Sequence, residues 1–289
     1  MKSFGTYHPL VIASYFIFVF FISCLSMHPV SLGIHFVSAV LFTLCHNGMK
    51  KTVRLILTLL PVGCLSVLMN VLFNHNGITI LAYFPNGNPL TKESLLYALC
   101  AALMLITVIL WCSALYCIMT SDMLIYLCGR AFPSLALMIS MALHFVPEFC
   151  RQWKVIANGQ ACIGKNEKTL KNTLRIFSIL ITRSLENAMD TADSMKSRGF
   201  GLMPRTSFSH YFFSVRNGIV LGILLLLGAY IMAGIFGTGF CFQYFPQIKS
   251  PEISFYPLSL WLCEALLFLL PVILSCWEEH RWTVSQSKI

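Results

Sequence analysis

The chain has 289 residues, of which 57% are hydrophobic and only 11% are charged. Soluble globular domains carry about a quarter charged residues, so this composition excludes an ordinary soluble protein and indicates one embedded in a lipid bilayer. The net charge of +9 predicts no nucleic-acid partner, because the basic residues flank apolar segments and fit the positive-inside rule of membrane proteins.

Six stretches are long and apolar enough to cross a bilayer as helices, which takes about 20 residues. We therefore predict an all-α polytopic membrane protein with about six transmembrane helices, at Pro9–Met27, Pro29–His46, Thr52–Phe73, Ser94–Thr120, Tyr211–Phe236 and Pro257–Trp277. A seventh apolar stretch, Phe132–Val146, is short for a span and precedes Pro147, which disfavours an unbroken helix. We expect it to lie at the membrane surface or against a partner protein.

The basic residues predict the orientation of the chain. Of the 20 lysines and arginines, 18 fall on one side of the predicted spans, and only Lys92 and Lys249 fall on the other. Because cytoplasmic segments carry the excess of basic residues, we expect a multi-pass protein of the cell inner or plasma membrane with both termini in the cytoplasm. The chain then divides into N-terminal membrane helices (1–120), a cytoplasmic domain (121–206) and C-terminal membrane helices (207–289).

The cytoplasmic segment from residue 148 to residue 206 is amphipathic. Apolar residues recur there at helical spacing in three successive stretches. The first stretch ends at Gly164, the second runs from Leu170 to Ile181, and the third runs from Leu185 to Gly199. We predict three amphipathic helices, two of which end at a glycine, the usual residue for the left-handed position after a helix.

The sequence contains no strong catalytic or metal-binding motif. Its twelve cysteines form no CxxC pair, and neither HExxH nor GxSxG occurs. The stretch Gly159–Lys165 matches the GxxxxGK part of a phosphate-binding loop, but Asn166 stands where a magnesium-binding Ser or Thr is required. The stretch also closes a helix, whereas a phosphate-binding loop opens one. We therefore predict a non-enzymatic chain with no cofactor, metal or nucleotide of its own.

Glu264 lies inside the last predicted span. An ionisable residue within a membrane is a functional candidate by default. The alternative is a structural carboxyl group that is hydrogen-bonded to a neighbouring helix or to a partner subunit.

The third amphipathic stretch carries a specific pattern. The pattern starts just before the stretch, at Arg183, includes Glu186 and ends in Met195-Lys196-Ser197-Arg198-Gly199-Phe200. This stretch resembles the second signature of a known family, the transmembrane T component of energy-coupling-factor transporters of the cobalt and biotin permease type. In that signature a helix closes on Ala-Met-x-x-Arg-Gly followed by an aromatic residue, and here Ser194 stands in place of the alanine.

The first amphipathic stretch is similar to the first signature of the same family. The matching run begins just before the stretch, with Phe145-Val146-Pro147, and ends with Gln160-Ala161-Cys162-Ile163-Gly164. The family signature has Arg-Phe-x-Pro and closes on Ala-Gln-x-Ala-Arg-Gly with the same spacing. In this chain His144, Gly159 and Ile163 replace the first arginine, the alanine and the last arginine.

The resemblance implies a coupling role without catalysis. In the family, each of the two helix ends docks on one of two ABC-type ATPase subunits, which bind the ATP, and the helical insert contacts a small substrate-binding membrane protein, the S component. Such an importer carries a vitamin or a transition-metal ion. The residues expected to dock on the ATPases are Cys162, Ile163, Gly164, Ser197, Arg198 and Gly199. Further partner-contact candidates are Phe145, Pro147, Gln160, Arg183, Glu186 and Met195.

Two other functions stay open at this point. A self-contained carrier of a small solute needs polar residues along several spans, and a membrane-bound enzyme needs acids, histidines or metal ligands clustered near one membrane face. Arg198 also has a purely structural interpretation, because a cation in the last turn stabilises the helix dipole by about 0.3–1 kcal/mol.

The predicted orientation can be tested by cysteine labelling in a variant that lacks the native cysteines. A cysteine at position 86 should react with an impermeant reagent from outside the cell. A cysteine at position 167 should react only after the membrane is opened, because the surrounding basic residues keep this segment in the cytoplasm. Labelling of position 167 from outside contradicts the topology.

Overall fold

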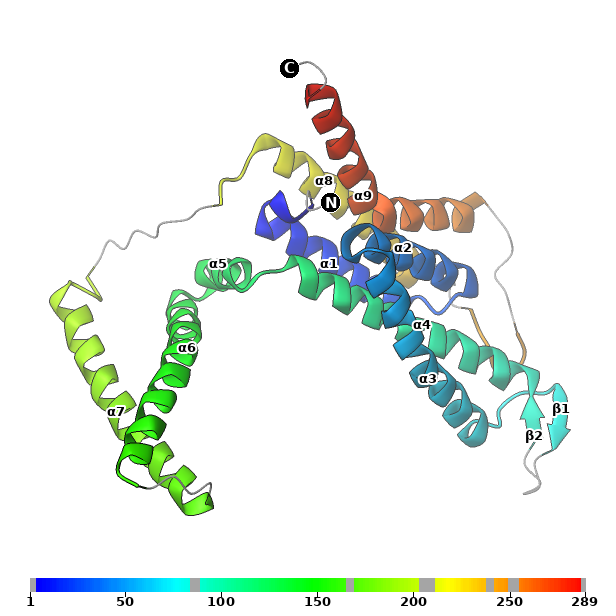
Figure 1. Ribbon diagram of the computed structural model, residues 1–289. Coiled ribbons are helices and arrows are strands. Elements are labelled where there is room, and N and C mark those ends of the chain that lie inside the picture. The colour runs from blue at the N-terminus through cyan, green and yellow to red at the C-terminus, as the bar shows by residue number, and fades with distance from the viewer. Residues whose placement is uncertain are drawn as a thin grey trace. The chain divides into compact units, whose positions relative to one another are not determined.

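The computed structural model describes residues 4–83, 89–164, 169–202, 211–237, 242–248 and 255–286. Its helices are α1 (Pro9–Leu25), α2 (Pro29–Asn47), α3 (Met49–Phe73), α4 (Lys92–Ile118), α5 (Ser121–Ala131), α6 (Pro133–Cys162), α7 (Leu170–Ser197), α8 (Val215–Gly237) and α9 (Phe255–Gln286), after a short 3-10 helix, η1 (Phe4–Thr6) (Figure 1). The predicted all-α class is confirmed. Between α3 and α4 the chain adds a small antiparallel ribbon of β1 (Ile80–Tyr83) and β2 (Pro89–Thr91).

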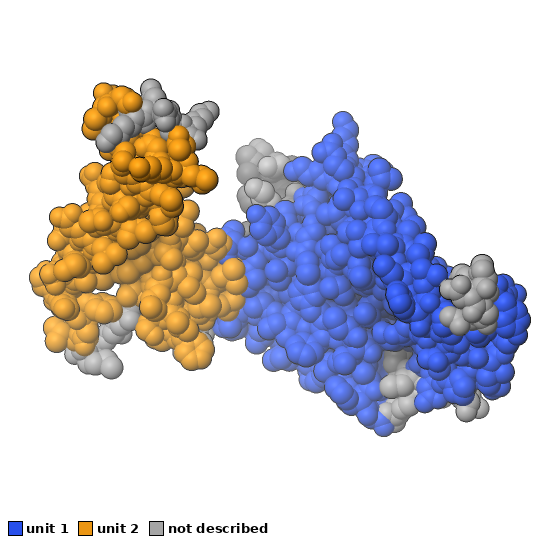
Figure 2. Space-filling model, turned by 90° about the horizontal axis from the view of Figure 1, so that it is seen from below, with its two compact units in different colours: residues 1–120, 211–289 blue, residues 121–210 orange. Residues whose placement is uncertain are grey.

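The chain divides into two compact units, which Figure 2 shows in different colours. Unit 1 combines residues 1–120 with residues 211–289, so that it contains α1–α4, α8 and α9. Unit 2 consists of residues 121–210 and contains α5, α6 and α7.

The core of unit 1 is a cluster of aromatic rings around Trp111. This side chain is fully buried on α4. Its ring lies 6.0 Å from Tyr15, 5.5 Å from Phe42 and 5.7 Å from Phe268, measured between centroids. These three residues come from α1, α2 and α9, so a single tryptophan joins four helices. Aromatic pairs at such distances contribute about 0.5–1.5 kcal/mol each beyond their burial.

Helices long and apolar enough to cross a membrane confirm a multi-pass membrane protein. By length and composition the described residues contain six: α2, α3, α4, α6, α8 and the part of α9 up to Trp277. The first predicted span is present as α1, an apolar helix of 17 residues, which is about 26 Å long. The apolar stretch Phe132–Val146 forms the first half of α6, apart from Phe132, which precedes the helix. Whether this stretch crosses the membrane is not tested by the structure, so its non-spanning role stays a prediction.

The three amphipathic helices predicted for the cytoplasmic segment are in fact two longer ones. The expected break at Pro147 is wrong, because this proline lies inside α6, which runs unbroken for 30 residues from Pro133 to Cys162. The proline removes one backbone hydrogen bond, while its neighbours remain helical. The second and third predicted helices form the single helix α7, because no glycine or proline interrupts the chain between Leu170 and Ser197.

The loop before α4 is more ordered than its polar composition suggests. The carboxylate of Glu93 accepts hydrogen bonds from the backbone N–H and the hydroxyl of Thr79, at 3.3 Å and 2.6 Å. The Thr91 hydroxyl donates to the carbonyl of Asn76 at 2.7 Å. These bonds fasten the ribbon to the first turn of α4. The turn signal in the sequence lies mostly at residues 86–88, outside the described residues.

Two glycines of α8 allow close helix packing. A Cβ atom on Gly234 would lie 2.5 Å from a methyl carbon of Leu260 on α9, and one on Gly228 would lie 2.6 Å from the ring of Phe18 on α1. Cβ atoms essentially never approach other atoms so closely, so a side chain at either position would force its neighbour to move; the neighbour is a rigid ring at Gly228 and a fully buried leucine at Gly234. Gly222 on the same helix has open space where its Cβ would be.

We therefore expect Gly234→Ala to destabilise the protein by about 1–3 kcal/mol through overpacking. The matched control is Gly222→Ala, which adds the same methyl group without a clash and should gain up to about 1 kcal/mol from helix propensity. Thermal unfolding of the two detergent-purified variants measures the difference. Equal midpoints contradict the close contact between α8 and α9 at Gly234.

Candidate functional site

The candidate site is built from the two long helices of unit 2. Helices α6 and α7 pack against each other and cross in Figure 1, and α5 packs against α6. Ile156 of α6 and Ile176 of α7 are buried. Most of the other residues of both helices are exposed, so the pair presents large surfaces outside its own small core.

Helix α6 ends in a left-handed glycine turn. Its last residue is Cys162, and the backbone N–H of the following Ile163 donates to the carbonyl of Gln160 at 3.2 Å. Gly164 has a φ of +80° and donates its N–H to the carbonyl of Ala161 at 3.0 Å. The Ile163 side chain, just before this turn, is 68% exposed. An aliphatic group therefore projects from the helix end.

Helix α7 ends in the same way, with both hydrogen bonds of a Schellman motif. The N–H of Gly199, whose φ is +83°, donates to the carbonyl of Lys196 at 3.0 Å, and the N–H of Phe200 donates to the carbonyl of Met195 at 3.0 Å. The hydroxyl of Ser197 donates to the carbonyl of Ser194 at 2.8 Å. The backbone carbonyls of Ser194, Met195 and Lys196 are thus satisfied before any partner binds.

Arg198 occupies the position that Ile163 has at the end of α6. It is exposed, and within the described part of the chain no carboxylate lies within 4 Å of its guanidinium group. The two helix ends therefore share one backbone geometry and differ in the side chain that they present. Both predicted glycine stops are confirmed by the positive φ angles of Gly164 and Gly199.

The length of α7 separates the two ends. This helix has 28 residues and is about 42 Å long. The end of α6 leads into the start of α7, as Figure 1 shows, whereas Ser197 and Arg198 lie at the far end of α7. The two glycine turns are therefore presented at two well separated places on unit 2.

An apolar stripe runs along the exposed side of α7. Its residues follow one another at spacings of three or four, and their exposed fractions lie between 44% and 82%: Leu170, Leu174, Phe177, Ile181, Leu185 and Met189. The stripe is about 29 Å long. An apolar surface of this extent on one helix marks a site for another protein or for lipid. The sequence predicted the stripe, and the structure leaves it uncovered by the described residues of unit 2.

Predicted contact residues of α7 line a polar groove on the opposite side of the helix from this stripe. Arg183 and Glu186 are both exposed and line a groove of about 610 Å³ together with five neighbours on the same helix: Ser178, Ile179, Thr182, Asn187 and Asp190. The groove therefore combines one cation with two carboxylates and several hydrogen-bonding groups.

The predicted contact residues of α6 do not gather at one place. The Phe145 ring stacks on Phe149 at 5.8 Å, Pro147 is exposed, and Gln160 lies half-buried in the last turn of the helix. They are spread along α6.

Glu264 has a neighbour that sequence reasoning missed. Its carboxylate, fully buried on α9, lies 3.8 Å from Nε2 of the equally buried His35 on α2. The imidazole ring stacks on Phe268 at 4.1 Å between centroids. The side-chain nitrogens and oxygens of both residues have no hydrogen-bond partner among the described residues. The rule that singled out Glu264, an ionisable group inside a span, could also have found His35.

The described residues contain no group of three or more histidines, cysteines, aspartates or glutamates that could hold a metal ion. The pair His35 and Glu264 is thus a two-residue polar contact inside unit 1, without a third ligand of these types.

No protein-family model matches the chain. A curated relative is the energy-coupling factor transporter transmembrane protein EcfT of Bacillus selenitireducens, which is 33% identical over 112 residues. The match covers 36% of this chain and 42% of the relative, so the chain spans less than half the length of this relative. The similarity confirms the resemblance to the T component that the signatures on α6 and α7 indicate.

The glycine turns predict the effect of adding one methyl group. Gly199→Ala and Gly164→Ala should each destabilise the helix end by about 1–2 kcal/mol, because a Cβ atom disfavours the left-handed conformation. The matched control is Gly159→Ala, at a glycine inside α6 with a helical backbone and open space. Thermal unfolding followed by circular dichroism compares the three variants. If all three have the same midpoint, the left-handed turns are not a constraint on the protein.

Proposed function

We propose that this chain is the transmembrane coupling subunit of an ATP-driven importer of the energy-coupling-factor type. Two ABC-type ATPase subunits bind the ends of α6 and α7, and a small substrate-binding membrane S component binds unit 2. The substrate is a vitamin or a transition-metal ion. The observation that carries the proposal is the pair of matching glycine turns at well separated helix ends, in a chain similar to EcfT.

Continuous helices suit the transmission of motion. The α7 helix joins the apolar stripe, which begins at Leu170, to the turn at Gly199 without a glycine or proline in between. We assign the stripe to the S component and the end at Arg198 to an ATPase. A displacement of the ATPase then moves both contacts together, because an uninterrupted helix has no hinge at which the motion could be lost.

Arg198 and Ile163 bind by different chemistry in this proposal. The exposed guanidinium group of Arg198 fits a cleft with carboxylates, where two parallel hydrogen bonds form. Truncating one partner of a desolvated charge pair at an interface costs about 2–5 kcal/mol. The side chain of Ile163, 68% exposed, makes no such bond, and its contact is limited to apolar burial of about 1.5–3 kcal/mol.

ATP is bound by the partners and not by this chain. The match to a phosphate-binding motif covers the last turns of α6, where Gly159 is helical and Gly164 ends the helix. A phosphate-binding loop instead presents its backbone N–H groups at the start of a helix. The N–H of Gly164 is already bonded to the carbonyl of Ala161, so it is not available to a phosphate.

A self-contained carrier is the second candidate function, and the buried pair of His35 and Glu264 is the observation that favours it. Ionisable groups inside a membrane often mark a substrate pathway. However, the cavity between α8 and α9 in unit 1 is lined only by aliphatic residues. The coupling subunit is the better supported function, because it also accounts for the exposed surfaces of unit 2.

The proposal predicts unequal effects at the two helix ends. Arg198→Ala should lower the retention of ATPase subunits on the purified complex by at least about tenfold, because a charge in the partner's cleft loses its counter-ion. Ile163→Ala should have a much smaller effect, since it removes only part of an apolar contact. Both are measured by ATPase retention in mild detergent and by substrate uptake in cells.

Lys196→Ala is the matched control, because Lys196 is an exposed cation two residues before Arg198. It should leave ATPase retention unchanged. If Ile163→Ala loses the ATPases and Arg198→Ala does not, the assignment of the dominant contact is wrong. If neither substitution changes ATPase retention or substrate uptake, the role of Arg198 is limited to stabilising the helix dipole. The proposed coupling role is then wrong.

A further inference from the structure

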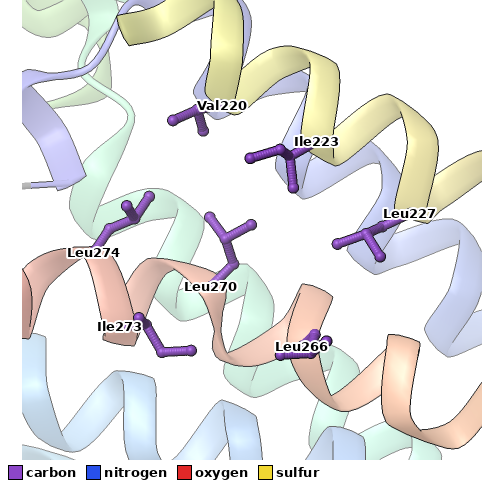
Figure 3. A pocket seen from close by; sticks show the side chains of 7 residues that line it. All are labelled: Val220, Ile223, Leu227, Leu266, Leu270, Ile273 and Leu274. Carbon is purple, nitrogen blue, oxygen red and sulfur yellow. The ribbon is translucent and has the colours of Figure 1, made fainter.

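Helices α8 and α9 form a wedge. Near the C-terminal end of α8 they touch, with Gly234 against Leu260 and a hydrogen bond of 2.9 Å between the hydroxyl groups of Tyr230 and Ser259. Toward the start of α8 the helices leave a cavity of about 260 Å³ between them (Figure 3). Its walls are Val220, Ile223 and Leu227 from α8 and Leu266, Leu270, Ile273 and Leu274 from α9.

The chemistry of the cavity is purely aliphatic. None of the seven lining side chains carries a nitrogen or an oxygen atom. Apolar cavities of about 150 Å³ stay dry and bind small apolar molecules, and this one is larger. Ile223, Leu266 and Ile273 are each about half exposed, at 45%, 45% and 52%. The cavity therefore opens at the surface of a bundle of membrane helices, where the surrounding solvent is hydrocarbon.

The shape of the wedge selects a thin occupant. An α-helix with its side chains is about 10–12 Å across. Since α8 and α9 remain in contact at Gly234 and Leu260, a helix cannot enter between them without separating this contact. A single alkyl chain can enter the open part of the wedge and leave the contact intact.

A cation lies just beyond the cavity, at the start of α8. Arg216 is one helical turn before Val220, on the same face of the helix, and it is exposed. Its guanidinium carbon lies 4.5 Å from the centre of the Tyr7 ring, which orients the group. Guanidinium groups bind phosphate through two parallel hydrogen bonds. On the predicted topology this end faces the cytoplasmic leaflet, which is rich in anionic lipids.

We infer that the wedge between α8 and α9 binds one acyl chain of an anionic phospholipid, whose phosphate group contacts Arg216. The aliphatic walls hold the chain, and the arginine selects the charge of the headgroup. This lipid site belongs to unit 1 and does not depend on the coupling role proposed for unit 2. The bound chain keeps α8 and α9 apart on the side of Gly234 that faces the start of α8.

The test uses the full chain, purified in mild detergent and incubated with equal amounts of phosphatidylglycerol and phosphatidylcholine. Native mass spectrometry then counts the lipids that each protein molecule retains. The unaltered protein should retain one phosphatidylglycerol in clear preference to phosphatidylcholine. Leu270→Trp fills the cavity and should lower retention at least about tenfold, because losing two buried methylene groups already has an effect of this size. Arg216→Gln should remove the preference for phosphatidylglycerol, and Arg216→Lys should restore part of it.

The control is Leu226→Trp, because Leu226 lies on α8 outside the cavity and is 75% exposed. It should retain the lipid like the unaltered protein. Ile223→Phe fills the cavity from the opposite wall, so that a folding defect of Leu270→Trp does not decide the result. Equal retention by the filling variants and the control overturns the inference. Equal retention of both lipids by the unaltered protein, or a second polypeptide bound in place of lipid, also overturns it.

Discussion

The interior of a bilayer offers no water to hydrogen-bond with the backbone, and this constraint shapes unit 1. A chain that crosses the membrane must satisfy its N–H and C=O groups within helices, and the described residues of unit 1 lie mainly in six apolar helices. The described ribbon of β1 and β2 lies in a loop between helices, where Thr79, Thr91 and Glu93 supply its extra hydrogen bonds. Helix packing then needs small residues, and Gly228 and Gly234 provide them.

The membrane spans and the helix ends at glycines were predictable from the sequence, because both depend on local chemistry. The spans follow from the length of apolar stretches, and the helix ends follow from Gly164 and Gly199, which adopt a conformation that other residues avoid. Helix continuity through Pro147 was not predictable, since it depends on how the neighbouring turns compensate for one lost hydrogen bond. The contact between His35 and Glu264 joins α2 to α9, and no sequence spacing relates residues so far apart in the chain.

The two units differ in where their apolar residues lie. In unit 1 they surround Trp111 and line the surface of a membrane bundle. In unit 2 the apolar stripe of α7 is exposed, and the charged groove at Arg183 and Glu186 lies on the opposite side of the same helix. A surface that is apolar on one side and charged on the other is stable in neither water nor lipid alone. It is typical of a protein that works between a membrane partner and a soluble one, as in the proposed complex.

The two helix ends show how one backbone geometry can serve two different contacts. Each glycine turn donates its N–H to a carbonyl of the last helical turn and fixes the direction of the preceding side chain. The end of α7 presents a guanidinium group at Arg198, whereas the end of α6 presents an aliphatic group at Ile163. A cleft with carboxylates that binds the first is a poor site for the second, because burying an unpaired carboxylate against an isoleucine is costly. On the proposed function, the two ATPase subunits therefore offer different clefts, which two different ATPase chains supply more readily than two copies of one.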